Sequence, residues 1–167
     1  MESAVATFEL DVAPLALAVE DLTTVVTGLA ADDALWRPRL RFRAEGRWWT
    51  RLHGDHVLDV WLLTWLADQS TDLHDHGGSA AAFTVVEGAL EEVRPQPGAG
   101  LTRAMIVAGA TSTVDPGVVH DVRNPAGTPA ISIHAYSPPL RQMTYYRRDA
   151  VGALTVDQVV RRQLEPS

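Results

Sequence analysis

The chain has 167 residues, of which 46% are hydrophobic and 21% charged, with a formal net charge of −7 and no cysteine. This balance is typical of a globular protein of one domain, and it excludes a disordered tail, a coiled coil and a collagen-like fibre. The acidic surplus argues against a nucleic-acid partner, no apolar run is long enough to span a bilayer, and the lack of cysteine excludes disulfides, thiolate metal sites and cysteine nucleophiles.

The N-terminal part is predicted to be helical between about residues 13 and 36. Apolar side chains recur there every three or four residues, which is the period of a helix with one buried face, and Pro14 suits a first helical position. These side chains are Leu15, Ala18, Leu22, Val25, Val26 and Leu29. Residues 1–14 contain three acidic side chains and no basic one, which is unlike a secretory signal peptide, so we expect a cytoplasmic protein.

From about residue 39 to 147 the pattern changes to short apolar or alternating runs separated by turn residues. The runs cover residues 47–52, 57–66, 80–87, 89–94, 104–107, 118–122, 130–136 and 143–147. Many short strands at regular spacing are typical of a β-sandwich or barrel. A further apolar pattern at about 155–164 predicts a short C-terminal helix. We therefore expect one all-β domain over 1–167, a barrel with a small helical part at its N-terminus.

Three histidines stand in positions that suit a metal site. His74 and His76 are two residues apart, and such residues point to the same face of a strand, so both imidazoles can reach one ion. A bare pair of this kind is more often two surface histidines. His120, which follows the turn Asp115-Pro116-Gly117 at the start of another predicted strand, is what favours a metal site.

These spacings resemble the two motifs of the cupin family, whose fold is a jelly-roll-like β-barrel. The matching residues are His74, His76 and Gly88 for the first motif and Pro116, Gly117, His120 and Asn124 for the second. Cupins usually place a glutamate ligand seven residues before the glycine, and this chain has Ala81 there. The resemblance therefore implies a metal site of three imidazoles, from His74, His76 and His120, without a carboxylate.

A site of three histidines in a cupin is typical of thiol dioxygenases, and two longer segments resemble cysteine dioxygenase. They are Ser70–Ser79, which contains both histidines of the first motif, and Ser132–Pro139, which reads Ser-Ile-His-Ala-Tyr-Ser-Pro-Pro. The resemblance extends from about Arg47 to Tyr146. It implies an Fe(II) enzyme that adds both atoms of O2 to a thiol and gives a sulfinic acid. It also implies a cis peptide bond between Ser137 and Pro138.

Ser132, His134 and Tyr136 are candidate catalytic residues. They alternate with apolar residues, so the three polar side chains share one face of a strand. If that face lines the barrel interior, the row forms a hydrogen-bonded relay that ends in a phenol, which the resemblance places beside the metal. Animal enzymes of the family cross-link this tyrosine to a cysteine. This chain has Ala81 at that position, so Tyr136 is expected to act as an unmodified phenol.

The segment Trp49-Thr50-Arg51 resembles the family segment that supplies a carboxylate-binding arginine. A guanidinium binds a carboxylate through two parallel N–H groups, which suits an amino-acid substrate. The resemblance also implies that Trp49, Leu63, Trp65 and Met143 line the substrate pocket. Arg51 stands closer to His74 than in the family, and five other arginines lie between residues 37 and 47, so another arginine remains an alternative anchor.

L-Cysteine is the substrate that the resemblance favours. The alternatives are 3-mercaptopropionate and a bulkier thiol such as ergothioneine, since tryptophan faces attract quaternary ammonium groups. A different class also stays open: a cupin that binds a metal or small ligand without catalysis, or an isomerase that uses zinc or manganese. The expected partners are a small thiol and O2, with neither nucleic acid nor membrane, in a monomer or small homo-oligomer.

Overall fold

The computed structural model describes residues 15–98 and 100–161. Its helices are α1 (Val19–Ala31), α2 (Asp33–Trp36) and the single 3-10 turn η1 (Arg37–Arg39). The strands are β1 (Trp48–Gly54), β2 (Asp59–Trp65), β3 (His74–Asp75), β4 (Ala80–Glu87), β5 (Ala89–Pro95), β6 (Leu101–Val107), β7 (Thr111–Val114), β8 (Asp121–Arg123), β9 (Ala130–Ser137), β10 (Gln142–Arg148) and β11 (Leu154–Arg161). The all-β prediction with a small helical part near the N-terminus is therefore confirmed.

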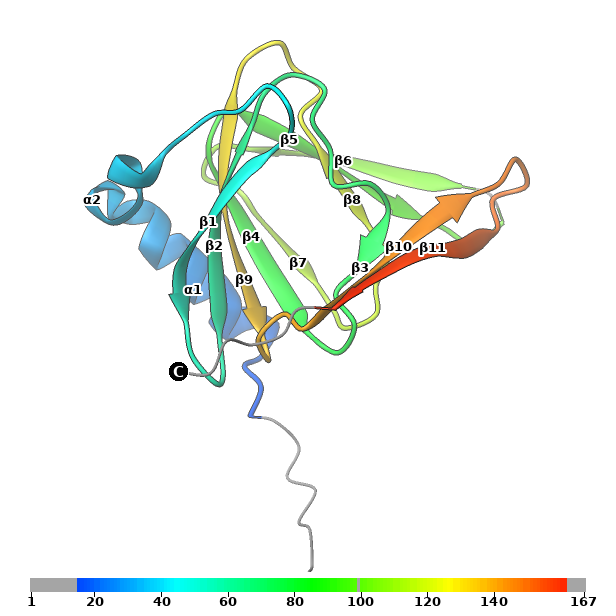
Figure 1. Cartoon of the computed structure of the whole chain (residues 1–167), viewed down its shortest axis with the longest axis horizontal. Coiled ribbons are helices and arrows are strands. Elements are labelled where there is room, and N and C mark those ends of the chain that lie inside the picture. Colours follow the sequence, from blue (N-terminus) through cyan, green and yellow to red (C-terminus); the bar gives the residue numbers. More distant parts are fainter. Residues whose placement is uncertain (1–14, 99, 162–167) are drawn as a thin grey trace, which may run out of the picture.

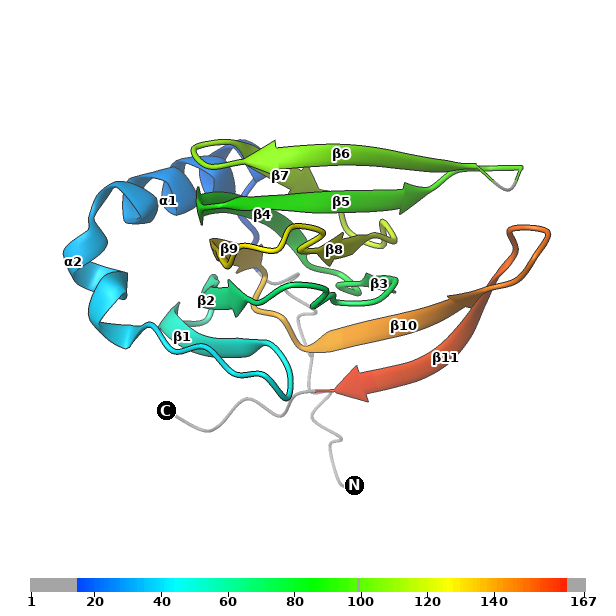
Figure 2. The same cartoon turned by 90° about the horizontal axis from the view of Figure 1, so that it is seen from above.

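Antiparallel sheets surround the interior of a barrel. One sheet has the order β1-β2-β9-β4-β7, and two smaller ones have the orders β11-β10-β3 and β6-β5-β8. Figures 1 and 2 show the β5–β6 hairpin and the β10–β11 hairpin as opposite walls, with β3 and β8 between them. This arrangement brings the short strands β3 and β8, at the two candidate histidine segments, to the same part of the interior.

Strand β9 lies in the middle of the largest sheet, between β2 and β4, and all of its residues are buried. Ile131, Ile133 and Ala135 belong to the core cluster that also contains Leu22 and Val26 of α1. Because successive side chains of a strand point to opposite faces, the intervening polar residues face the barrel interior. The sequence pattern predicted that the polar and apolar residues of β9 lie on opposite faces, and the structure shows that the apolar face packs against α1.

Helix α1 begins later than the apolar spacing predicts. Ala18 is extended, and the backbone N–H of Leu17 donates to Ser137 Oγ at 2.8 Å, so this segment is tied to the barrel rather than coiled. The helix therefore starts at Val19, and the predicted first position, Pro14, lies outside the described residues.

The predicted C-terminal helix at about 155–164 is wrong, because residues 154–161 form strand β11 and pair with β10. Tyr145 pairs with Gln158 and Tyr146 with Val156, which leaves Asp157 as an extra residue in the ladder. Such a bulge breaks the alternation of side chains, so valines at positions 156, 159 and 160 resemble a helical spacing. Residues 162–164 lie outside the described part of the chain.

Two local features of the predicted motifs are present. The peptide bond between Ser137 and Pro138 is cis, as the resemblance implied. Gly88 joins β4 to β5 with a φ of +78°, and a Cβ atom there would lie 2.7 Å from the carbonyl oxygen of Pro129. Only glycine fits this position without moving the backbone.

Among the described residues, no helix is long and apolar enough to cross a bilayer.

Replacing Leu22 with alanine should destabilise the fold by about 2–4 kcal/mol, because it opens a cavity between α1 and the outer face of the sheet. Leu22 is 0% exposed, whereas Leu35 of α2 is 50% exposed and provides the same substitution at the surface. Urea unfolding of both variants measures the difference. A loss for Leu22→Ala no larger than that for Leu35→Ala would contradict this account of the helix.

Candidate functional site

Three histidines meet inside the barrel. His74 lies on β3, His76 two residues later, and His120 directly before β8. The backbone N–H of His74 donates to the carbonyl oxygen of His120 at 2.8 Å, and the N–H of His120 donates back to that of His74 at 2.9 Å. All three residues are buried. The structure therefore brings together the three predicted metal ligands.

The ring nitrogens of the cluster have the separations of ligands around one ion. His74 Nε2 lies 3.1 Å and His120 Nε2 3.4 Å from His76 Nε2. Two nitrogens that each lie ~2.1 Å from one metal ion, at angles near 90–110°, are about 3.0–3.4 Å apart. The possible ligand atoms of the three residues all lie within 4.8 Å of one another, and no carboxylate belongs to this group. The donor set therefore fits a divalent transition metal that accepts imidazole.

Burial favours the neutral form of two of these imidazoles, which metal binding requires. Burial and, to a smaller extent, the nearby His120 lower the pKa of His74 to about 3, against the opposing hydrogen bond to Asp72. Burial, followed by the charges that His74 and His120 would carry, also holds the pKa of His76 well below its usual value. The lone pairs of these two rings are consequently free at neutral pH.

Two acidic side chains, Asp75 of β3 and Glu87 of β4, have partners other than the histidines. Asp75 accepts hydrogen bonds from the backbone N–H of Gly77 and from the Tyr146 hydroxyl. Glu87 forms an exposed ion pair with Arg37 at 2.7 Å. Ala81 pairs with Tyr136 across the ladder of β4 and β9 and offers no ligand atom. These contacts are compatible with a centre made of imidazoles.

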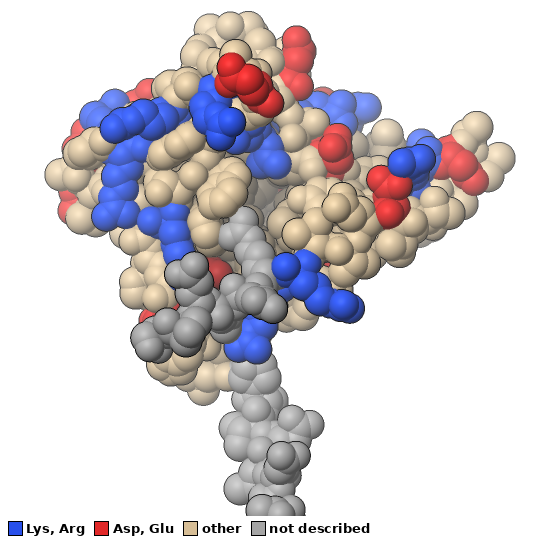
Figure 3. Space-filling view, viewed as in Figure 1, with Lys and Arg blue, Asp and Glu red and all other residues tan. Residues whose placement is uncertain are grey.

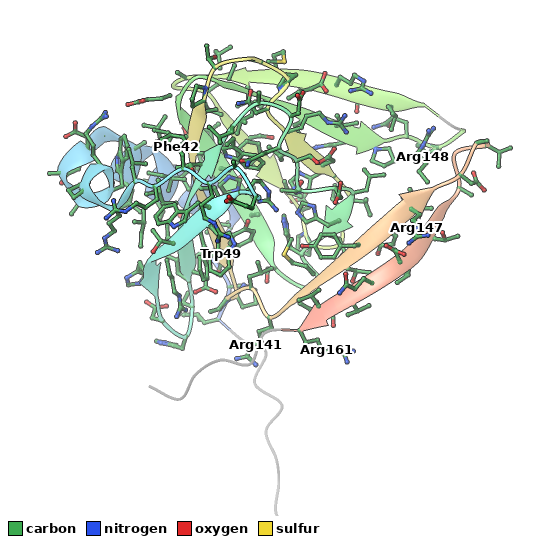
Figure 4. All side chains as sticks on the ribbon, turned by 45° about the horizontal axis from the view of Figure 1, so that its top comes forward. Phe42, Trp49, Arg141, Arg147, Arg148 and Arg161 are labelled. Atoms are coloured by element: carbon green, nitrogen blue, oxygen red, sulfur yellow. The ribbon has the colours of Figure 1, made fainter. Side chains whose placement is uncertain are left out.

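A cavity opens onto the histidine cluster. It encloses about 650 Å³, part of it open to solvent, and its lining combines the three histidines with aromatic and apolar side chains. Figure 4 shows Trp49 on β1, on the side of the barrel that faces the β10–β11 hairpin, where Arg147 and Arg148 are labelled. Among the described residues that line the cavity, none is an aspartate or glutamate. The cavity thus suits a small ligand that carries negative charge.

The arginine in the cavity wall is Arg47, not Arg51. Arg47 is half-buried, and its Nε–H donates to the carbonyl oxygen of Ser70 at 2.9 Å. Burial lowers the pKa of its guanidinium, against the opposing influence of nearby tyrosines and aspartates. An arginine nevertheless stays charged in proteins. Within residues 15–98 and 100–161 no ion pair to Arg47 is present, so its charge is available to a ligand.

Arg51 lies four residues after Arg47, on β1, and its guanidinium is bound to a different group. Its Nε–H donates to Asp59 Oδ1 at 2.7 Å, and Nη2 contacts the same oxygen. Asp59 is buried and also accepts from the backbone N–H of Leu140. Arg51 does not line the cavity. The structure therefore places Arg51, the predicted substrate anchor, outside the cavity wall and Arg47 in it. Figure 3 shows that basic side chains gather over the segment between α2 and β1.

The polar row of β9 faces the cavity at two of its three positions. His134 and Tyr136 line it, and the rings of Tyr136 and His76 meet edge to face with centroids 4.9 Å apart. Ser132 Oγ lies 2.7 Å from His134 Nε2, and Trp65 Nε1–H donates to the same hydroxyl at 2.8 Å. An indole N–H can only donate, so it occupies a lone pair of the serine oxygen. The serine O–H therefore remains free to donate to His134 Nε2 and orient that ring. The rings of His134 and Tyr136 stack with centroids 6.5 Å apart.

The sequence matches the family model of cysteine dioxygenase type I over residues 11–149. The chain belongs to this family. Solved cupin and double-stranded β-helix structures share its fold. The protein TT1209 of Thermus thermophilus is 21% identical (TM-score 0.54) and is matched over 61% of this chain and 92% of that one. An uncharacterized conserved protein with a double-stranded beta-helix domain from Klebsiella pneumoniae is 19% identical (TM-score 0.55), over 61% and 80% of the two chains. An RmlC-like cupin protein from Desulfovibrio desulfuricans is 23% identical (TM-score 0.51), over 59% and 89%.

The predicted pocket residues of this cysteine dioxygenase family member divide into two groups. Trp49, Leu63 and Met143 line the cavity, together with Trp61, whose ring meets that of Trp49 edge to face. Trp65 does not line it. Instead, Trp65 is fully buried, and the Arg47 guanidinium lies over its ring at 5.0 Å. Trp65 therefore supports both the charged wall of the cavity and, through Ser132, the polar row of β9.

Glu92 is a residue of this site that the sequence analysis missed. It lies on β5, is 4% exposed, and accepts a hydrogen bond from His120 Nδ1 at 2.8 Å. Ser112 Oγ donates to its other carboxylate oxygen at 2.7 Å, and Arg94 Nη2 lies 3.0 Å from the first. Burial alone would raise the pKa of Glu92, but these hydrogen bonds and the charges of His120 and Arg94 lower it overall. The carboxylate therefore stays ionised inside the barrel.

The metal-free protein should lose stability as the pH falls from 7 to 5. Burial holds the pKa of His134 well below its usual value. Below a pH of ~6.5, the unfolded chain therefore gains a proton on this imidazole that the folded chain does not. His134→Gln removes this contribution and should reduce the loss by about 2 kcal/mol. Urea unfolding at both pH values measures it, with His56→Gln at an exposed position as the control. Equal losses in all three proteins would contradict the neutral, buried state of His134.

Proposed function

We propose that the protein is an Fe(II) thiol dioxygenase that converts a small thiol carrying a carboxylate, in the first place L-cysteine, and O2 to the sulfinic acid. The observation that carries this proposal is the convergence of three buried imidazoles in one cavity with Arg47 and Tyr136. Each turnover adds both oxygen atoms to the sulfur, R–SH + O2 → R–SO2H, so no external reductant is required.

His74, His76 and His120 would hold the metal. Bound iron supplies the redox chemistry that O2 needs, and a site with only three protein ligands leaves further positions for substrate and O2. Zinc has no redox chemistry and would not support the reaction. Tyr136 lines the same cavity as the three histidines and contacts the His76 ring.

Arg47 would bind the substrate carboxylate. Its guanidinium is fixed by the hydrogen bond to Ser70 and by the Trp65 ring beneath it, and it provides the only formal positive charge of an arginine or lysine in the described cavity lining. A planar guanidinium binds a carboxylate through two N–H groups and so sets the orientation of the substrate as well as its affinity. The carboxylate on Arg47 and the sulfur on the metal would hold the substrate at two points.

Tyr136 would act on the bound substrate or O2 through its hydroxyl. Ser132 would orient the His134 ring, which stacks with the ring of Tyr136, and the aromatic surroundings would strengthen a hydrogen bond that the phenol donates. Because the cavity lining offers no acidic side chain to an ammonium group, the amine of cysteine would have to reach the metal. A carboxylate thiol without an amine needs no acidic partner in the cavity, so 3-mercaptopropionate is the second candidate substrate.

The direct test is oxygen uptake by the iron-loaded protein with L-cysteine, 3-mercaptopropionate, ergothioneine and cysteamine. We expect one O2 to be consumed per thiol, with both atoms of 18O2 recovered in the sulfinic acid. The zinc-loaded protein should be inactive with the same metal content. Uptake of O2 without a sulfinate product, or no uptake with any thiol, would leave the cupin as a binding protein and refute the proposal.

Arg47→Met should lower kcat/KM for carboxylate thiols by about 30- to 1000-fold, which corresponds to the ~2–4 kcal/mol lost when one partner of a desolvated charged pair is removed. Cysteamine, which has no carboxylate, should be affected little. The matched variant is Arg51→Met, which removes the same charge four residues later in the sequence. The Arg51 side chain is already paired with Asp59. Steady-state oxygen uptake measures kcat/KM for the two variants. A larger loss of kcat/KM in Arg51→Met than in Arg47→Met would identify Arg51 as the residue that binds the carboxylate.

Tyr136→Phe removes one hydroxyl and no packing volume, so metal and thiol should still bind while kcat falls. Thiol binding followed by isothermal titration, together with turnover by oxygen uptake, separates the two effects. Full turnover with every thiol would show that the phenol has only a packing role.

A further inference from the structure

The three histidines differ in the hydrogen-bond partners of their Nδ1 atoms. Nδ1 of His74 lies 2.9 Å from the backbone carbonyl oxygen of Asp72, and Nδ1 of His76 is buried without a hydrogen-bond partner among the described residues. His120 alone contacts a carboxylate, that of Glu92. The three imidazoles therefore differ in the group that contacts the Nδ1 atom, on the side of the ring opposite the candidate ligand atom Nε2.

We propose that Glu92 is a positioning residue for the metal centre, which fixes the proton of His120 on Nδ1 and makes this imidazole the strongest donor of the three. The inference deepens the proposed function and rests on the metal site described there. An ionised carboxylate can only accept a hydrogen bond, so the nitrogen that faces Glu92 must carry the proton. The Nε2 lone pair of His120 then points to His76 and the rest of the cluster.

The position of Glu92 is itself fixed from two sides. Ser112 of β7 donates to one carboxylate oxygen, while Arg94 of β5 lies beside the other. The contacts join strands of two sheets, and β5 pairs directly with β8, which begins one residue after His120. The carboxylate therefore holds the ring of His120 from a rigid part of the barrel. A carboxylate behind a metal-bound imidazole raises its basicity, and loss of such a partner commonly weakens metal binding 10- to 100-fold.

Glu91 provides a matched control on the same strand. Its side chain forms an ion pair with Arg103 at 2.7 Å and has no contact with the histidines. Glu91→Gln and Glu92→Gln change the net charge equally and are adjacent in sequence, but only the second removes the charge behind His120.

The experiment measures binding of Co(II) to the metal-free proteins by competition with a chelator, with the Co(II) absorption spectrum as a second readout. We expect Glu92→Gln to raise the dissociation constant about 10- to 100-fold and to change the spectrum, while Glu91→Gln stays within about threefold of the parent chain. Thermal unfolding of the metal-free variants reports any general damage to the barrel. An equal affinity for Glu92→Gln and Glu91→Gln would overturn the inference.

A measurement on the unaltered protein does not depend on how the variants fold. The 15N chemical shifts of the His120 ring in the metal-free protein identify which nitrogen carries the proton. A proton on Nδ1 supports the inference, and a proton on Nε2 overturns it. Because both experiments use metal binding and protonation rather than turnover, they can succeed where thiol oxidation is absent, so failure of the proposed function would be distinguishable from failure of this inference.

Discussion

The reciprocal backbone hydrogen bonds between His74 and His120 are the constraint on which the site depends. They join segments 46 positions apart in the sequence as an isolated antiparallel bridge. Side chains of directly paired residues in such a bridge lie on the same face. His76, two residues after His74, returns to that face. One bridge between two short segments thus brings three imidazoles together, and the surrounding sheets serve to keep these segments in register.

The parts of the site that the sequence predicts are those fixed by local spacing. A His-x-His pair in extended backbone and a Ser-x-His-x-Tyr row in a buried strand each define a face without reference to the remainder of the fold. The apolar residues between the polar ones of β9 also identify which face is outside, since Ile131 and Ile133 pack with Leu22 of α1. Strand periodicity and the helix that covers it therefore lead to the same arrangement.

The parts that the sequence does not predict depend on contacts between distant segments. Arg47 and Arg51 occupy the same face of the β1 segment, and only the buried Asp59 on the next strand diverts Arg51 from the cavity. Glu92 stands beside another glutamate. Its one sequence signal is its place two residues after Leu90, on the inner face of β5, where an acid is unexpected. Strand β11 was not recognised in the sequence because it is almost entirely exposed, so its apolar and polar residues are not required to alternate. The bulge at Asp157 interrupts the alternation further.

The charges around the cavity would favour the proposed substrate, which carries two negative groups. Imidazole ligands do not offset the charge of a divalent ion, and the carboxylate of Glu92, which contacts His120, is itself partly compensated by Arg94. Arg47 adds a further positive charge at the wall of a cavity lined by aromatic rings, where water screens charge poorly. A thiolate at the metal and a carboxylate at Arg47 would together balance this excess. A thiol without a carboxylate would leave the guanidinium unpaired, and a cationic substrate would have to approach it without an acidic side chain nearby. The same electrostatic arrangement that would favour the binding of a small thiol acid would therefore disfavour a positively charged thiol.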